Sequence, residues 1–203
     1  MPRPVLTAAL LLIFFGVSVL GNTRSAEPVK SNVPLSDDEI AIYQVVLQQY
    51  VTSKEADRLD VSVRTYPFDP NSHRSGVTAD CLRGIELQNL ASIAHTFHLL
   101  TPNVLTVKNS RLVDPDKQSQ IVRENDPDKT MRKGKSVSEA VNEAYSTALF
   151  SLSEIAFDKE NRHAVVSYSY WCGALCGHGS TLVFERVGNI WKKMDRHCGG
   201  WIS

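Results

Sequence analysis

The sequence predicts an α+β fold in which helices pack on a C-terminal, four-stranded antiparallel meander, with one or two further short strands. Two segments combine a helix capping box with apolar residues at helical spacing, and they begin at Ser36 and Ser136. Four segments between residues 149 and 198 alternate apolar and polar residues, or are rich in β-branched and aromatic residues, as strands are. We expect a single α+β domain at 36–203.

Residues 1–21 have the pattern of a secretory signal peptide. Arg3 precedes an uncharged apolar run at 5–20, and Gly21 supplies a small residue for cleavage. The run is shorter than the about 20 residues that a membrane-spanning helix needs. We therefore expect cleavage and a secreted or periplasmic protein without a membrane span, with an uncleaved anchor as the alternative. Residues 22–35 are polar and unpatterned, and we expect a mobile leader there.

Three helices are expected in the first three quarters of the chain. The first follows Ser36, the second covers 82–99 with His95 and His98 on its solvated side, and the third follows Ser136. Segment 108–135 is highly charged and repeats Asp-Pro-Asp-Lys at 114–117 and 126–129. We expect a long mobile loop with at most one irregular helix. Its aspartates are interpreted as turn residues, because the glycine and distal glutamate of a calcium loop are missing.

The four expected strands lie at 149–157, 163–171, 180–187 and 190–198. The last two are joined by Gly188-Asn189, which is typical of a type II′ hairpin with glycine at the first central position. A further short strand is expected at 61–66 and another at 104–107. The apolar face of the meander needs cover, which the upstream helices can supply.

The charge of the chain is balanced, with 22 basic and 22 acidic residues. Binding to nucleic acid or to an anionic membrane surface requires a basic excess, so we expect neither partner. We expect no cofactor.

Several C-terminal motifs form one recognisable arrangement: 153–158 (SEIAFD), 164–166 (AVV), 172–179 (CGALCGHG), 191–193 (WKK) and 201–203 (WIS). This arrangement resembles a group of exported bacterial proteins that share a Cys-Gly-rich β-meander ending in Trp-Ile-Ser. The resemblance covers 149–203 well and the helical part loosely. It implies a bacterial, exported α+β protein, and because no activity is assigned to the group it implies no catalytic residue.

The four cysteines are Cys81, Cys172, Cys176 and Cys198. An even number in an exported chain indicates disulfides, for which three pairings exist. We expect Cys172–Cys176, whose small loop gives about 2 kcal/mol, and Cys81–Cys198, whose long loop gives about 5 kcal/mol in the chain-entropy description. Two alternatives remain: a tetrahedral zinc site from Cys172, Cys176, His178 and Cys198, or a free reactive thiol.

Two functions of different classes are consistent with these residues. The first is a non-enzymatic structural, binding or inhibitory module with a protein or small-molecule partner. Its expected binding surface comprises Trp171, Gly173, Leu175, Gly177, His178, Trp191 and Trp201. The second is a metal- or thiol-dependent hydrolase with a site made of Cys172, Cys176, His178, His197 and Cys198. No local catalytic signature accompanies that cluster, so we favour the binding module.

Overall fold

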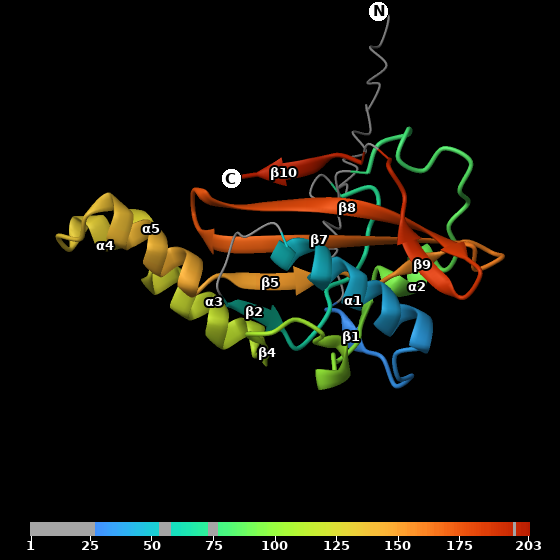
Figure 1. Ribbon diagram of the computed structural model, residues 1–203, viewed down its shortest axis with the longest axis horizontal. Coiled ribbons are helices and arrows are strands. Elements are labelled where there is room, and N and C mark those ends of the chain that lie inside the picture. The colour runs from blue at the N-terminus through green and yellow to red at the C-terminus, as the bar shows by residue number, and fades with distance from the viewer. Residues whose placement is uncertain (1–26, 53–57, 73–76, 197) are drawn as a thin grey trace, which may run out of the picture.

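The structure, a computed structural model, describes residues 27–52, 58–72, 77–196 and 198–203. The expected signal peptide at 1–21 lies outside the described residues, and so does His197. The described chain has an α+β fold, with helices packed around one large, curled sheet (Figure 1). Within those ranges, no helix combines the length and the apolar character needed to cross a membrane.

Helices and strands alternate irregularly along the chain. The helices are α1 (Asp37–Thr52), α2 (Leu90–Ile93), a 3₁₀ turn (Pro102–Val104), α3 (Pro115–Glu124), α4 (Pro127–Arg132) and α5 (Val137–Ser146). The first four strands are β1 (Val29–Lys30), β2 (Leu59–Ser62), β3 (Thr96–Phe97) and β4 (Ser110–Val113). The later strands are β5 (Leu149–Leu152), β6 (Ala156–Phe157), β7 (His163–Gly173), β8 (Cys176–Val187), β9 (Ile190–Lys193) and β10 (Gly200–Ile202).

The main sheet is larger than the expected four-stranded meander. It has eight strands in the order β10-β8-β7-β5-β2-β4, with β6 beside β7 and β9 beside β8. The neighbours β5–β7, β7–β8 and β8–β9 run antiparallel, but β2 runs parallel to both β4 and β5. Parallel strands need a long crossover connection, and the chain that links β4 to β5, on either side of β2, contains α3, α4 and α5. The sheet is therefore mixed, because β2 and β4 extend it beyond β5.

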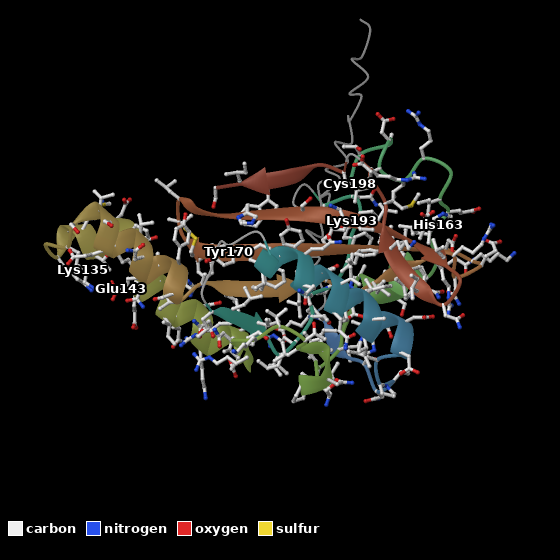
Figure 2. The ribbon with its side chains drawn as sticks, in the orientation of Figure 1. Lys135, Glu143, His163, Tyr170, Lys193 and Cys198 are labelled. Atoms are coloured by element: carbon white, nitrogen blue, oxygen red, sulfur yellow. A yellow bond between two sulfur atoms is a disulfide. The ribbon has the colours of Figure 1, made fainter. Side chains whose placement is uncertain are left out.

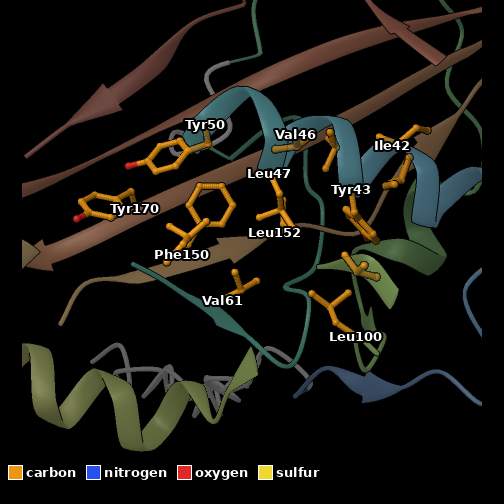
Figure 3. Close-up of a cluster of buried hydrophobic side chains, with 14 of the residues drawn as sticks. Ile42, Tyr43, Val46, Leu47, Tyr50, Val61, Leu100, Phe150, Leu152 and Tyr170 are labelled. Carbon is orange, nitrogen blue, oxygen red and sulfur yellow. The ribbon is translucent and has the colours of Figure 1, made fainter. Parts of the chain in front are cut away.

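The larger hydrophobic cluster lies between α1 and the sheet (Figure 3). Helix α1 begins as expected, since the Ser36 hydroxyl accepts the N–H of Glu39 at 3.3 Å and the Glu39 carboxylate accepts the N–H of Ser36 at 2.7 Å. Side chains one turn apart on α1 then reach the same face of the sheet. The fully buried members of the cluster include Ile42, Tyr43, Leu47, Val61, Phe150, Leu152, Ala164 and Phe184.

A second, smaller hydrophobic cluster lies on the other face of β7. Successive side chains of this strand point alternately into the two clusters. Ala164 and Val166 belong to the large cluster, whereas Val165 belongs to the small one. The small cluster is buried beneath the irregular segment 77–93, and Phe68, Cys81, Ala156 and Val183 complete it. The expected helix at 82–99 is wrong: only α2 is helical, and the chain turns with positive φ at Gly84 (75°) and Asn89 (56°).

The charged segment 108–135 is also different from the expected loop. It contains β4, α3 and α4, because both Asp-Pro-Asp-Lys copies begin helices. Asp114 caps α3 by accepting the N–H groups of Asp116 and Lys117, and Asp126 caps α4 by accepting the N–H of Asp128. Proline then occupies the first turn, where its missing N–H costs nothing. The aspartates are thus helix caps.

Two shorter expectations also need correction. The described part of the expected leader, 27–35, contains β1, which runs parallel to β3 and hydrogen-bonds to it through Val29 N–H and His95 carbonyl at 2.8 Å. The expected strand at 104–107 is replaced by the 3₁₀ turn that Pro102 begins. In contrast, the capping box at Ser136 and Glu139 and the two-residue turn with Gly188 at φ 64° are as predicted.

Two disulfides are present, and they are the expected pairs. Cys81 bonds to Cys198 across 117 positions, and Cys172 bonds to Cys176 across four. The first ties the irregular segment 77–93 to the chain that leads into β10. The second closes the turn between β7 and β8. Cys198 lies far from the helical end of the molecule, where Lys135 and Glu143 form an ion pair (Figure 2).

Candidate functional site: a tyrosine-lined cleft

A large cleft lies at the end of the sheet where β7, β8 and β10 meet α5, and its volume is about 970 Å³. We call it the tyrosine cleft. Its lining consists of Tyr145, Tyr168, Tyr170, Cys172, Leu175, Cys176, Gly177, His178, Gly179, Ser180, Gly200, Trp201, Ile202 and Ser203. This volume is in the range of small-molecule sites in proteins.

Strand register gathers the aromatic floor of the tyrosine cleft. Tyr168 and Tyr170 are two residues apart on β7 and therefore share a face. His178 on β8 lies opposite Tyr170 and Ser180 lies opposite Tyr168, while Ile202 on β10 lies opposite His178. One rung of the sheet thus carries Tyr170, His178 and Ile202 side by side.

Aromatic packing holds this floor in place. The Tyr170 ring is 5.5 Å from both His178 and Tyr50, and Tyr50 stacks on His178 at 5.8 Å. Tyr145 reaches Tyr170 from α5 at 6.4 Å, and the Tyr170 hydroxyl donates to the Tyr145 carbonyl at 3.3 Å. Such ring pairs are worth about 0.5–1.5 kcal/mol each beyond their buried area. The floor therefore exists before any ligand arrives.

The disulfide turn forms one rim of the cleft, and α4 holds it. The Asp126 carboxylate accepts the N–H of Ala174 at 2.7 Å. A Cβ at Gly173, where φ is 149°, would lie 2.9 Å from that carboxylate oxygen, so glycine is required for this approach. The turn leaves the Leu175 side chain 79% exposed, and Ile202 is 90% exposed. Both rims thus present apolar side chains to solvent.

The lining of the cleft carries no formal positive or negative side chain: none of its members, as far as the structure describes the chain, is Asp, Glu, Lys or Arg. A charged ligand would lose its hydration here without an Asp, Glu, Lys or Arg side chain to pair with, which is unfavourable. Hydroxyl groups, the His178 imidazole and peptide groups are the polar features that remain. The cleft is consequently suited to an uncharged ligand.

Four of the seven residues expected to form a binding surface line this cleft: Leu175, Gly177, His178 and Trp201. The other three do not. Trp191 is only 6% exposed and donates its indole N–H to Asp38 at 3.0 Å, so it belongs to the core. Trp171 packs under the Arg123 guanidinium, 5.9 Å from its ring centre, and Gly173 is buried beneath Asp126.

The cluster expected for a metal or thiol site is not assembled. Cys172 and Cys176 pack with the large hydrophobic cluster, while Cys198 packs with the small one. All four sulfur atoms are in disulfides, so none is a thiolate for zinc or for nucleophilic attack. His178 takes part in the aromatic floor instead. His197 lies outside the described residues.

Sequence reasoning missed Tyr145 and Asp126 as site residues. Tyr145 lies near the end of the helix expected after Ser136, and it is 42% exposed at the mouth of the cleft. Asp126 had a signal in the sequence, because Asp-Pro is typical of a helix start. Nothing local in the sequence indicates that its second oxygen reaches Ala174.

The imidazole of His98 is also placed differently from the expected solvated helix face. It contacts the buried Glu154 carboxylate through Nδ1 at 2.8 Å, and the backbone N–H of His98 donates to the same carboxylate at 2.9 Å. The Thr65 hydroxyl donates a third hydrogen bond. This group is not part of the tyrosine cleft.

Comparison of the chain with protein-family models, with curated proteins and with solved structures finds no match.

Proposed function

We propose that the protein is a non-enzymatic binding module and that the tyrosine cleft holds its ligand. The observation that carries this proposal is the combination of a cleft of about 970 Å³, a rigid aromatic floor and a described lining without Asp, Glu, Lys or Arg side chains. Ligand sites in proteins are mostly apolar cavities with a few placed polar groups. The ligand that suits this lining is an uncharged molecule with an apolar ring.

The way the floor is held supports this choice of ligand. Tyr170 is 2% exposed and is fixed by ring contacts on several sides, so little side-chain freedom is left for a ligand to remove. The exposed side chains of Leu175 and Ile202 add apolar contact at the two rims. Binding energy then comes from burying rings and aliphatic groups.

We further propose that the protein acts outside the reducing cytoplasm, as a secreted or periplasmic protein. Two disulfides in one chain support this, because such bonds persist in oxidising compartments. The signal-like pattern at 1–21 and the resemblance to exported bacterial proteins support it too.

Binding of the neutral fluorophore N-phenyl-1-naphthylamine tests the cleft. We expect saturable fluorescence enhancement with the native protein. Tyr145→Ala removes the ring at the mouth while leaving the carbonyl that Tyr170 uses, and we expect roughly 3- to 10-fold weaker binding for the loss of one ring contact.

The control is Val137→Ala, which removes a 66%-exposed apolar side chain from the same helix outside the cleft. It should leave binding of the fluorophore unchanged. If the native protein gives no saturable signal, or if both variants weaken it equally, the tyrosine cleft is not the ligand site.

A further inference from the structure

A second cleft lies on the opposite face of β7 from the tyrosine cleft. It lies between the chain that follows β2, strand β7 and the end of β10, and its volume is about 380 Å³. Its lining consists of Tyr66, Pro67, Phe68, Asp69, Ser72, Ser167, Ser169 and Trp201. Ser167 and Ser169 alternate along β7 with Tyr168 and Tyr170. Strand β7 therefore presents serine side chains to this cleft and tyrosine side chains to the tyrosine cleft. We call it the serine cleft.

The Trp201 indole forms one wall of the serine cleft. On its rung of the sheet Trp201 lies opposite Gly179, which lies opposite Ser169. The ring rests on the backbone of β8: a Cβ at Gly179 would overlap the indole, and one at Gly177 would lie 3.2 Å from it. Glycine at these positions therefore lets the indole lie against the strand, so its orientation is fixed.

Polar groups without a protein partner line the same cleft. Within the ranges that the structure describes, the hydroxyls of Tyr66 and Ser169 form no hydrogen bond with the rest of the chain. The Ser167 hydroxyl, by contrast, is paired with the Thr181 hydroxyl at 2.6 Å. Burial also raises the pKa of Tyr66 above its ordinary value, which keeps this hydroxyl protonated as a donor.

We propose that the serine cleft binds one or two rings of a neutral sugar. A sugar presents an apolar C–H face that stacks on an indole and hydroxyl groups that exchange hydrogen bonds with Tyr66 and Ser169. The carboxylate of Asp69 adds an acceptor at the rim. The volume lies at the lower end of the range for ligand sites, which suits a ligand of this size.

Other ligand classes fit the lining less well. A purely apolar ligand would cover the Tyr66 and Ser169 hydroxyls and leave them unpaired, which is unfavourable. An anion would meet the carboxylate of Asp69, and no Lys or Arg is among the described lining residues. A hydroxyl-bearing, uncharged ligand satisfies both constraints.

Saturation-transfer NMR and calorimetric titration with cellobiose, maltose and N,N′-diacetylchitobiose test the proposal on the oxidised protein. At least one disaccharide should bind. Tyr66→Phe and Ser169→Ala each remove one hydroxyl with little change of shape, and each should weaken binding roughly 3- to 10-fold, as expected for one neutral hydrogen bond.

Matched controls exist for both variants. Ser151 lies opposite Ser169 on β5 but does not line the cleft, so Ser151→Ala should bind the sugar like the native protein. Tyr145→Phe, in the tyrosine cleft, should likewise have no effect. The proposal is overturned if none of the three disaccharides binds, or if Ser151→Ala weakens binding as much as Ser169→Ala. Trp201 lines both clefts, but Tyr66 and Ser169 line only the serine cleft and Tyr145 only the tyrosine cleft, so loss of sugar binding and loss of fluorophore binding are separate outcomes.

Discussion

Buried carboxylates are the residues on which the core places the strictest demands, because each needs donors to replace its hydration. Asp60 meets this demand with Arg58 and Arg111. Burial raises its pKa, but the bonds to the two guanidinium groups outweigh burial and hold the pKa below its ordinary value. Glu154 is only 1% exposed and relies on Thr65 and His98.

His98→Ala should therefore destabilise the protein by about 1.5–3 kcal/mol, the usual range for a hydrogen bond to a buried charged group. The matched control is His95→Ala, three positions away, whose side chain is exposed. It should change stability by less than about 0.5 kcal/mol. Urea unfolding of both variants measures the difference. Equal losses would show that the contact with Glu154 contributes nothing specific.

At the scale of elements, helices and turns that short sequence motifs specify were predictable. Elements whose conformation depends on contacts with distant segments were not. Both capping boxes and the Gly188 turn follow from short motifs. Segment 82–99 has apolar residues at helical spacing, yet most of it packs on the small cluster as irregular chain. The repeat Asp-Pro-Asp-Lys is compatible both with a turn and with the start of a helix. The burial of Val122 on α3 and of Thr130 on α4 favours the helices.

The two Asp-Pro-Asp-Lys copies provide a matched pair for the next prediction. Asp114 and Asp126 both cap helices, but only Asp126 also accepts the N–H of Ala174 in the disulfide turn. Asp126→Ala should thus cost the cap, about 1 kcal/mol, and the second bond besides. It should also weaken fluorophore binding, because the rim that carries Leu175 loses its support.

Asp114→Ala should give the smaller loss of stability and leave fluorophore binding unchanged. Urea unfolding and fluorescence titration measure both quantities on the same samples. If the two variants behave alike in the titration, Asp126 acts only as a helix cap.

On the scale of the whole molecule, the partners of each strand and the position of the clefts depend on contacts between distant segments. Alternation at 163–187 predicted two strands well, because each of their faces is covered by a different cluster. The pairing of β2 with β4 and β5 could not be predicted from a comparable pattern in the sequence of these strands. The tyrosine cleft combines α5, β7, β8 and β10, so single motifs revealed its rim but not its floor.

The two disulfides operate at this largest scale in different ways. Cys81–Cys198 closes a loop of 117 positions and Cys172–Cys176 a loop of four. Replacing both cysteines of a pair by serine should therefore cost about 5 kcal/mol for the first pair and about 2 kcal/mol for the second. Thiol labelling of the unreduced, unfolded native protein should find no free cysteine.

The two double replacements should affect fluorophore binding in the opposite order to their effect on stability. Cys172→Ser/Cys176→Ser releases the turn that carries Leu175 at the rim of the tyrosine cleft, so it should weaken fluorophore binding. Cys81→Ser/Cys198→Ser removes a bond within the small cluster, and its folded fraction should bind with native affinity. Urea unfolding followed by fluorescence titration at low temperature separates the two effects. A double variant at 81 and 198 that stays folded yet loses fluorophore binding would contradict this division between a bond that stabilises the fold and a bond that shapes the cleft.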